Sequence, residues 1–177
     1  MRYTHFGEGA YAETEASIRA LLAEAGGKRL GDATRARTET SDPRVATPET
    51  YLGFARAQGF VPSRPLPGTN RYPPLGDELA PSRFALSGVW RVNEESATAV
   101  RRAVIHARVV ARKVFLVLSA RGSKPRDVEV LLDGEPLRRI TVRDQRLYPL
   151  LSLPEVADQR VALRVDPGVS AYAFTFG

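Results

Sequence analysis

The chain of 177 residues contains no cysteine, and its two histidines, His5 and His106, stand in unrelated stretches of sequence. The lack of cysteine excludes disulfides, thiol–disulfide exchange and cysteine-ligated metals within this chain. Two isolated histidines do not predict a zinc site. The sequence also lacks a run of about 18 apolar residues, the length that a membrane-spanning helix requires. We therefore expect no metal, no cofactor and no membrane span.

The first 15 residues, MRYTHFGEGAYAETE, lack the apolar core of a secretory signal peptide. If Met1 is the natural start of the protein, this absence predicts a cytoplasmic location.

The chain has 26 Lys and Arg against 20 Asp and Glu, a formal net charge of +6. A basic chain suggests an anionic partner such as nucleic acid. The cations are spread along the sequence, however, in pairs such as Arg101-Arg102 rather than in runs of five or more. Nucleic-acid binding is therefore not favoured.

Strands dominate the C-terminal two thirds of the sequence. Residues 114–118, VFLVL, are apolar on both faces and predict a central buried strand. Residues 127–132 end at Asp133-Gly134, a dipeptide that supplies the positive φ angles of a hairpin turn. Residues 97–111 fit either a helical face or a strand, and their β-branched residues favour the strand. Further strands are expected at 84–92, 138–142, 146–151, 160–165 and 169–176. Short strands at this spacing indicate a β-sandwich or jelly roll.

The N-terminal third contains one clear amphipathic helix, which begins at Tyr11 and ends at Ala25 before Gly26-Gly27. Residues 28–46 are polar and aperiodic, as expected of a linker. Thr47 and Pro48 are expected to begin a brief helix that runs through Arg56. Proline-rich residues 60–80 predict irregular, extended backbone.

Several segments then carry a family resemblance. RYTHFGEGAYAETEASIRALLAEAG resembles the last strand and last helix of the thioredoxin-like domain in DipZ-type cytochrome c biogenesis proteins. TPETYLGFARA, FALSGVW, ARKVFLVLS, VEVLLDG and the terminal GVSAYAFTFG resemble the C-terminal domain of those proteins, a jelly roll similar to carbohydrate-binding modules. Among these segments, PETYLG and AYAFTFG are the more specific.

The resemblance predicts a mainly β chain: an antiparallel, galactose-binding-like jelly-roll β-sandwich with one N-terminal helix. Its expected parts are a thioredoxin-like remnant at 1–27, the linker at 28–46 and the sandwich at 47–177. Phe84 stands where tryptophan is expected in relatives. The Cys-x-x-Cys pair of the family is missing, so its redox activity does not carry over to this chain.

The resemblance therefore implies a non-catalytic accessory module of an extracytoplasmic thiol–disulfide system, with carbohydrate as the candidate ligand. The alternative is a structural or protein-interaction domain that docks to a thioredoxin-like domain. In a further form of this alternative, the chain forms a homo-oligomer through the helix from Tyr11 to Ala25, whose apolar residues need cover.

Four residues are candidates for a ligand site. Trp90, the only tryptophan, could stack on a sugar ring, although a core position beside Phe84 is the favoured alternative. Arg146 and Tyr148 precede Pro149, which suggests a strand edge or bulge that opens a polar groove. Ordinary surface and edge positions are the favoured alternative for this pair. Tyr72 either contributes to a groove or pins the proline-rich coil, and pinning is expected.

No acid–base pair is evident. Glu94-Glu95 are neighbours on a turn, and Asp127 and Glu129 alternate on one strand, so neither pair predicts the facing carboxylates of a glycosidase. A calcium site at Asp127 and Glu129 lacks a compact oxygen-rich loop. His106 has no identifiable Ser or Asp partner, and Ser87-Gly88 is not a nucleophile elbow. We therefore expect no enzyme activity, and a hydrolase is the least favoured class.

Overall fold

The computed structural model describes residues 11–26, 44–76, 78–122 and 124–177. It divides into two compact units, Met1–Thr40 and Ser41–Gly177. In the first unit, the predicted helix is present as α1, Tyr11–Glu24. The strand expected at the N-terminus and nearly all of the expected linker lie outside the described residues. No helix in the described part of the chain is long and apolar enough to cross a membrane.

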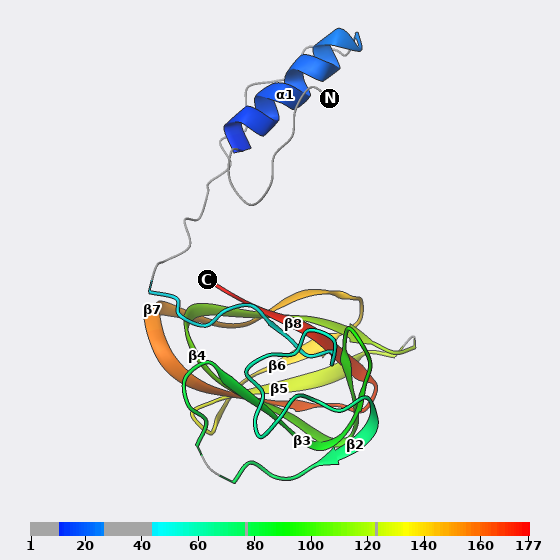
Figure 1. The fold of residues 1–177 in the computed structure, drawn as a ribbon, viewed down its shortest axis with the longest axis vertical. Coiled ribbons are helices and arrows are strands. Elements are labelled where there is room, and N and C mark those ends of the chain that lie inside the picture. The colour runs from blue at the N-terminus through cyan, green and yellow to red at the C-terminus, as the bar shows by residue number, and fades with distance from the viewer. Residues whose placement is uncertain (1–10, 27–43, 77, 123) are drawn as a thin grey trace. The chain divides into compact units, whose positions relative to one another are not determined.

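The described residues of the second unit form eight strands (Figure 1). Their bounds are β1 Thr50–Tyr51, β2 Gly68–Tyr72, β3 Arg83–Val92, β4 Ala97–Ala120, β5 Arg126–Leu132, β6 Glu135–Val142, β7 Arg146–Val165 and β8 Val169–Phe176. These eight strands pair with one another in antiparallel fashion, and an isolated parallel bridge joins Phe60 to Phe84 of β3.

The pairings create two layers. In sheet I the order is β2, β3, the first half of β4, the second half of β7, β5 and β6. In sheet II it is β1, β8, the second half of β4 and the first half of β7. Both long strands therefore pass from one layer to the other, and Figure 1 shows their curvature. Alternate apolar residues of the two layers form one core, as expected for a sandwich. The predicted jelly-roll fold class is confirmed.

Two strand predictions missed this continuity. Residues 97–111 and 114–118 were expected as separate strands, as were 146–151 and 160–165, but each pair belongs to one long strand. The register between β4 and β7 shifts between Ala111 and Lys113, where β4 bends. At this bend the amides of Arg112 and Lys113 both donate to the carbonyl of Gly177, at 3.0 and 2.6 Å. The bend therefore has its backbone groups satisfied without ending the strand.

The helix expected from Thr47 to Arg56 is wrong. Thr50 and Tyr51 instead form β1, which pairs with Phe174 and Ala173 on the edge of β8. Only a single turn follows, closed by the Ala57 amide donating to the Gly53 carbonyl at 3.0 Å. Hydrogen bonds to a strand edge thus outweigh the local helix signal, which is a weak preference. The proline-rich coil also contains a strand that the sequence did not predict, β2, which pairs with β3.

The pairing of β3 with β4 is interrupted at Gly88 by a β-bulge. Ser87 pairs with Val104 and Val89 pairs with Arg101, so two residues of β4 lie opposite Gly88. Gly88 has φ +86°, and a Cβ there would lie 2.0 Å from the Arg102 carbonyl oxygen. Arg102 itself has φ +48°. Only glycine fits opposite this strained residue.

Candidate functional site

Trp90 is a core residue. Its side chain is fully buried, and Nε1 donates to the Ser87 carbonyl at 2.9 Å. Trp90 therefore has the core position that was the favoured alternative, and neither face of its ring is free to stack on a sugar. Phe84 is also buried, 5.6 Å from the Phe174 ring by centroids. An aromatic at either position serves the core.

Tyr148 is buried as well, with 3% of its surface exposed, so the surface position favoured for it is wrong. Its hydroxyl accepts from the Arg143 amide at 3.2 Å and donates to the Asp144 carbonyl at 2.9 Å. The guanidinium carbon of Arg146 lies 4.7 Å from the Tyr148 ring centroid, so Arg146 covers this ring. The predicted edge and bulge are present, because β7 shifts register beside Pro149 and pairs there only with β4 among the described strands. This edge and bulge do not open a polar groove at Tyr148, because its ring is buried and covered by Arg146.

Tyr72 pins the coil, as expected. Its hydroxyl accepts from the Leu66 amide at 3.0 Å, and partial burial raises the pKa of Tyr72. Of the four candidate residues, Arg146 and Tyr148 contact each other.

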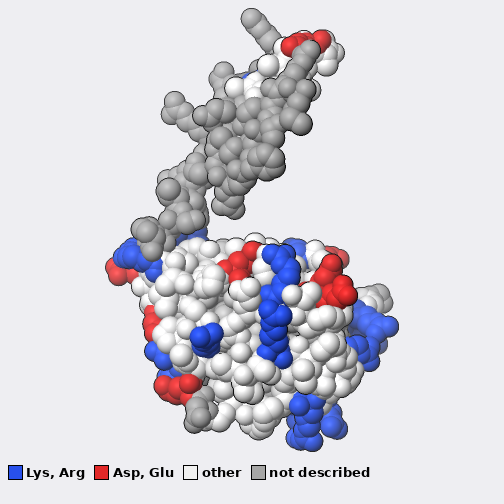
Figure 2. All heavy atoms as spheres, viewed as in Figure 1, with Lys and Arg blue, Asp and Glu red and all other residues white. Residues whose placement is uncertain are grey.

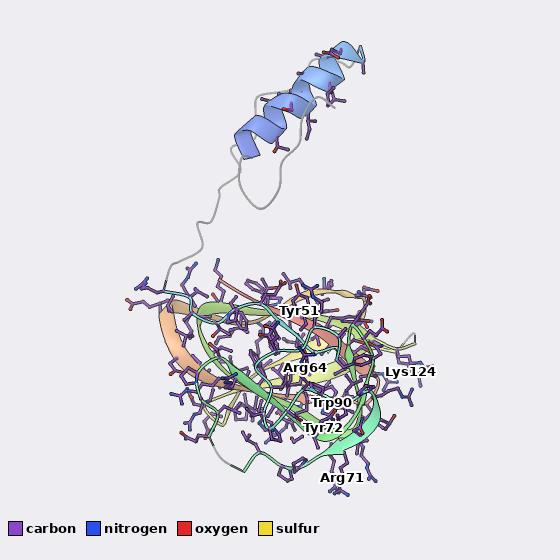
Figure 3. All side chains as sticks on the ribbon, in the orientation of Figure 1. Tyr51, Arg64, Arg71, Tyr72, Trp90 and Lys124 are labelled. Atoms are coloured by element: carbon purple, nitrogen blue, oxygen red, sulfur yellow. The ribbon has the colours of Figure 1, made fainter. Side chains whose placement is uncertain are left out.

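A different pair of tyrosines forms a pocket of about 380 Å³. We call it the tyrosine pocket; it is lined by Tyr51, Ala55, Arg56, Glu94, Glu95, Tyr172 and Ala173. The pairing of β1 with β8 brings the two tyrosines together, since Tyr51 lies opposite Ala173 and the Leu52 amide donates to the Tyr172 carbonyl at 2.8 Å. In Figure 3 Tyr51 lies well away from Trp90 and Tyr72.

Two turns build the rest of the tyrosine pocket. The amides of Phe54 and Ala55 donate to the carbonyls of Asn93 and Glu94, at 2.9 and 3.2 Å. The turns approach so closely that a Cβ on Gly53 would lie 2.2 Å from the Glu94 carbonyl oxygen. The Asn93 side chain also accepts from the Glu95 amide at 2.9 Å. These contacts fix the backbone that carries the pocket's polar groups before any ligand binds.

The polar groups of the tyrosine pocket are arranged around an aromatic ring. The guanidinium carbon of Arg56 lies 3.6 Å from the Tyr51 ring centroid, a cation–π contact. The Tyr51 hydroxyl donates to Glu49 at 2.5 Å, and this hydrogen bond is the main cause of the raised pKa of Tyr51. Glu94 and Glu95 are exposed carboxylates at the rim. The pocket thus offers aromatic surface together with hydrogen-bond donors and acceptors.

The sequence contained a signal for the tyrosine pocket. Tyr51 lies in PETYLG and Tyr172 in AYAFTFG, the two segments that were the more specific part of the family resemblance. Sequence reasoning used these segments only for the resemblance. Because about 120 residues separate them along the chain, their contact depends on the fold.

A second hollow lies on the outer face of sheet I. This charged groove of about 560 Å³ is lined by Arg102, Ala103, Val104, Asp127, Glu129, Arg139, Arg164, Val165, Asp166 and Pro167. Arg164 pairs with Glu129 at 2.9 Å, and Thr141 donates to Asp127 at 2.9 Å. In the described part of the chain no group of three His, Asp or Glu is placed to hold a metal ion.

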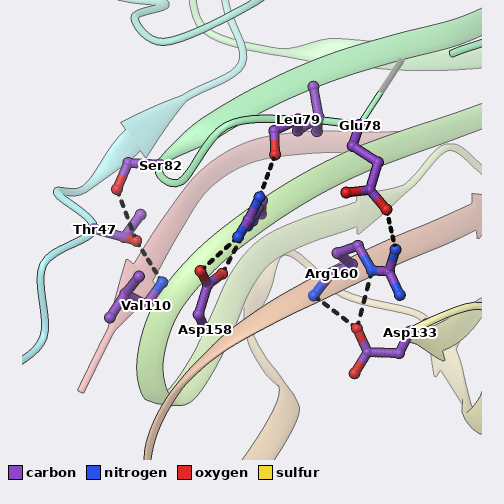
Figure 4. Close-up of polar contacts among 9 residues, drawn as sticks. Thr47, Glu78, Leu79, Ser82, Val110, Asp133, Asp158 and Arg160 are labelled. Carbon is purple, nitrogen blue, oxygen red and sulfur yellow. Dashed lines mark hydrogen bonds and ion pairs between the residues drawn. The ribbon is translucent and has the colours of Figure 1, made fainter. Parts of the chain in front are cut away.

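Residues 78–79 cross the same face of sheet I (Figure 4). Arg108 donates to the Leu79 carbonyl at 3.0 Å and pairs with Asp158 at 2.9 Å. Arg160 contacts Glu78 at 2.5 Å and Asp133 at 3.2 Å. The hydrogen bond from Arg108 lowers the pKa of Asp158. A cavity of about 450 Å³ under this segment shares Arg164 with the charged groove.

His106 has a partner that the sequence did not reveal. Its Nε2 lies 3.0 Å from the Ser87 hydroxyl oxygen, and burial lowers the pKa of His106. Among the described residues no carboxylate is hydrogen-bonded to His106, so the contact supplies only part of a nucleophilic triad.

Cations are otherwise spread over the sandwich. On the face drawn in Figure 2, one short band of Lys and Arg is flanked by Asp and Glu, and other cations are scattered. That nucleic acid is not a partner remains a prediction.

The fold and the pocket define an antiparallel jelly-roll domain with a small, preformed surface pocket. Residues 47–177 match the family described as "Thioredoxin like C-terminal domain", and the chain belongs to this family. The whole chain is also similar to Protein DipZ of Mycobacterium bovis and of Mycobacterium tuberculosis, with 28% identity over 183 residues in each case. The resemblance inferred from the sequence is thereby confirmed. The chain spans about a quarter of the length of these relatives.

Solved structures with similar folds include a family two carbohydrate esterase from Cellvibrio japonicus. It matches with a TM-score of 0.48 and 16% identity, over 52% of this chain and 30% of the esterase chain. Carbohydrate-binding module CBM36, in complex with calcium and xylotriose, matches with a TM-score of 0.35 and 13% identity. That match covers 51% of this chain and 81% of the module.

Proposed function

We propose that this chain is a non-catalytic accessory module of an extracytoplasmic thiol–disulfide protein and that it binds carbohydrate in the tyrosine pocket. Family membership and the DipZ relatives support the accessory role. The cysteine-free sequence supports a role outside the thiol chemistry itself. The extracytoplasmic location follows from the family resemblance.

The tyrosine pocket is the observation that carries carbohydrate binding. The C–H groups of a pyranose pack well on an aromatic face, while its hydroxyls require both donors and acceptors. Tyr172 supplies one ring, and Tyr51 supplies the ring face that Arg56 does not cover. Arg56 supplies donors, and Glu94 and Glu95 supply acceptors. Because the two turns hold their backbone in place, binding requires little ordering of the chain.

Calorimetric titration of the folded chain with a panel of oligosaccharides tests this proposal. Tyr51→Ala should weaken binding about tenfold or more, which corresponds to about 1.4 kcal/mol. Tyr72→Ala is the matched control, since Tyr72 is a partly exposed tyrosine outside the pocket, and it should leave the affinity unchanged. Trp90 fluorescence is a poor reporter here because the indole is buried.

Binding that is equally weak in both tyrosine variants would contradict the pocket, and the absence of binding to any oligosaccharide would contradict the function. Thermal unfolding followed by circular dichroism shows whether each variant is still folded.

The second candidate function is protein interaction through α1. Ile18, Leu21 and Leu22 fall at helical spacing on one face, and each is between 42% and 51% exposed. A contiguous apolar stripe of this kind is typical of an interaction surface. Self-association of the chain, measured by sedimentation velocity, distinguishes this candidate from a purely sugar-binding role.

A further inference from the structure

Arg102 occupies an unusual position at the edge of the charged groove. It is exposed, lines the groove, and has φ +48° in the bulge opposite Gly88. A side-chain-bearing residue at positive φ is strained, and such strain persists only where the surrounding structure enforces it. Here the enforcement comes from Gly88, whose missing Cβ makes room for the Arg102 carbonyl.

The other charges of the groove are already engaged. Arg164 is paired with Glu129 at 2.9 Å, and Arg139 lies 4.0 Å from Asp127. Asp127 also accepts from Thr141, and Asp166 accepts from the Asp127 amide at 2.9 Å. None of the described carboxylates forms an ion pair with Arg102, so its guanidinium is the groove's uncommitted charge.

The mixed lining restricts the anion that fits. Three carboxylates in the groove would repel a phosphodiester chain, which carries a full charge at every unit. They would instead accept hydrogen bonds from hydroxyl groups. A ligand with one carboxylate among many hydroxyls suits both kinds of group. Its carboxylate pairs with the Arg102 guanidinium, and its hydroxyls donate to the groove's carboxylates.

We propose that the charged groove binds an oligosaccharide containing uronic acid and that Arg102 pairs with its carboxylate. This inference rests on the proposed carbohydrate-binding function. It places the acidic sugar in a site that shares no lining residue with the tyrosine pocket.

The test compares xylotriose that carries a single glucuronic acid with the methyl ester of the same oligosaccharide, which has the same rings and hydroxyls but no charge. Calorimetry should show that the wild type binds the acid about tenfold more tightly than the ester, the effect of one charge-assisted pair. Arg102→Gly should remove this preference. Glycine accepts φ +48° without strain, so this variant should unfold at the same temperature as the wild type or higher.

Arg101→Ala is the matched control. Arg101 is the exposed neighbour of Arg102, outside the groove lining, and its replacement removes the same charge. It should change the affinity for the acid less than twofold, as expected of a charge that makes no direct contact.

Equal losses in the two arginine variants would overturn the inference in favour of diffuse attraction. Equal binding of acid and ester would also overturn it, and if Tyr51→Ala abolished that binding the proposed function would stand. No binding of either saccharide, nor of any other oligosaccharide, would overturn the proposed function together with the inference.

Discussion

Trp90 and Tyr51 lie in opposite surroundings, and we propose a ligand-binding role only for Tyr51. Trp90 is fully buried on β3, where its Nε1 is satisfied by the Ser87 carbonyl. Tyr51 lies on the two-residue strand β1, with Arg56 over its ring and Glu49 on its hydroxyl. Stacking on a ligand requires a ring face that the ligand can reach. The tyrosine pocket supplies accessible aromatic groups, and the core tryptophan does not.

At the residue scale, we expect His106 to make stability depend on pH. Burial lowers its pKa below the ordinary 6.5, so the unfolded chain binds the proton more readily than the folded chain. Stability should therefore be full above pH 6.5 and fall as the pH drops below it. Urea unfolding between pH 8 and pH 5 measures this, and His106→Gln should remove this contribution.

The unmodified chain, unfolded in the same series of buffers, is the control. A His106→Gln variant with an unchanged pH profile between 5 and 8 would assign that dependence to other groups.

Among the elements, β4 and β7 determine the architecture. Each passes through both sheets, so the two layers are covalently continuous through both strands, and β7 joins the edge of sheet II to the centre of sheet I. β4 also carries the extra residue of the bulge opposite Gly88 of β3. This bulge places Arg102 at the charged groove. The irregularities of β4 thus shape both sheets and position Arg102, the binding residue that we propose for the charged groove.

At the element scale, we expect Gly88→Ala to destabilise the sandwich by roughly 3 kcal/mol or more, from positive φ together with a backbone clash. A Cβ at this position would lie 2.0 Å from the Arg102 carbonyl oxygen. Gly134→Ala separates the two causes, because Gly134 has φ +94° but no atom within 4 Å of a Cβ. It should cost only about 1–2 kcal/mol. Equal free energies of unfolding for the two variants would show that the clash is relieved by a backbone shift.

For the molecule as a whole, our proposal is a binding module of the family, and α1 adds an exposed apolar stripe to it. A helix of 14 residues is marginally stable in water without a packing partner. A second copy of the chain could cover the stripe formed by Ile18, Leu21 and Leu22.

At this scale, we expect the chain to self-associate, with an average mass that rises with concentration in sedimentation velocity. Leu21→Glu should shift the equilibrium to monomer by placing a charge within the apolar stripe. Leu137→Glu replaces a similarly exposed leucine, 46% against 48%, on β6 of the sandwich, and should have no effect. A monomer at every concentration would contradict this prediction.

The sequence by itself determined the fold class and the family. Alternating apolar residues predict half-buried strands wherever they occur, and Asp133-Gly134 predicts a hairpin whose positive φ angles of 50° and 94° the structure confirms. These signals are local, because side chains alternate between the faces of a strand whatever its neighbours are.

Only the tertiary structure decided where each strand ends, which aromatics are accessible, and which residues share a pocket. The helix expected after Thr47 yields to strand pairing because β8 presents free backbone groups that Thr50 and Tyr51 satisfy. The same pairing brings Tyr51 to Tyr172, and a bulge brings Arg102 to the groove. Such contacts join segments far apart along the chain, so no local pattern encodes them.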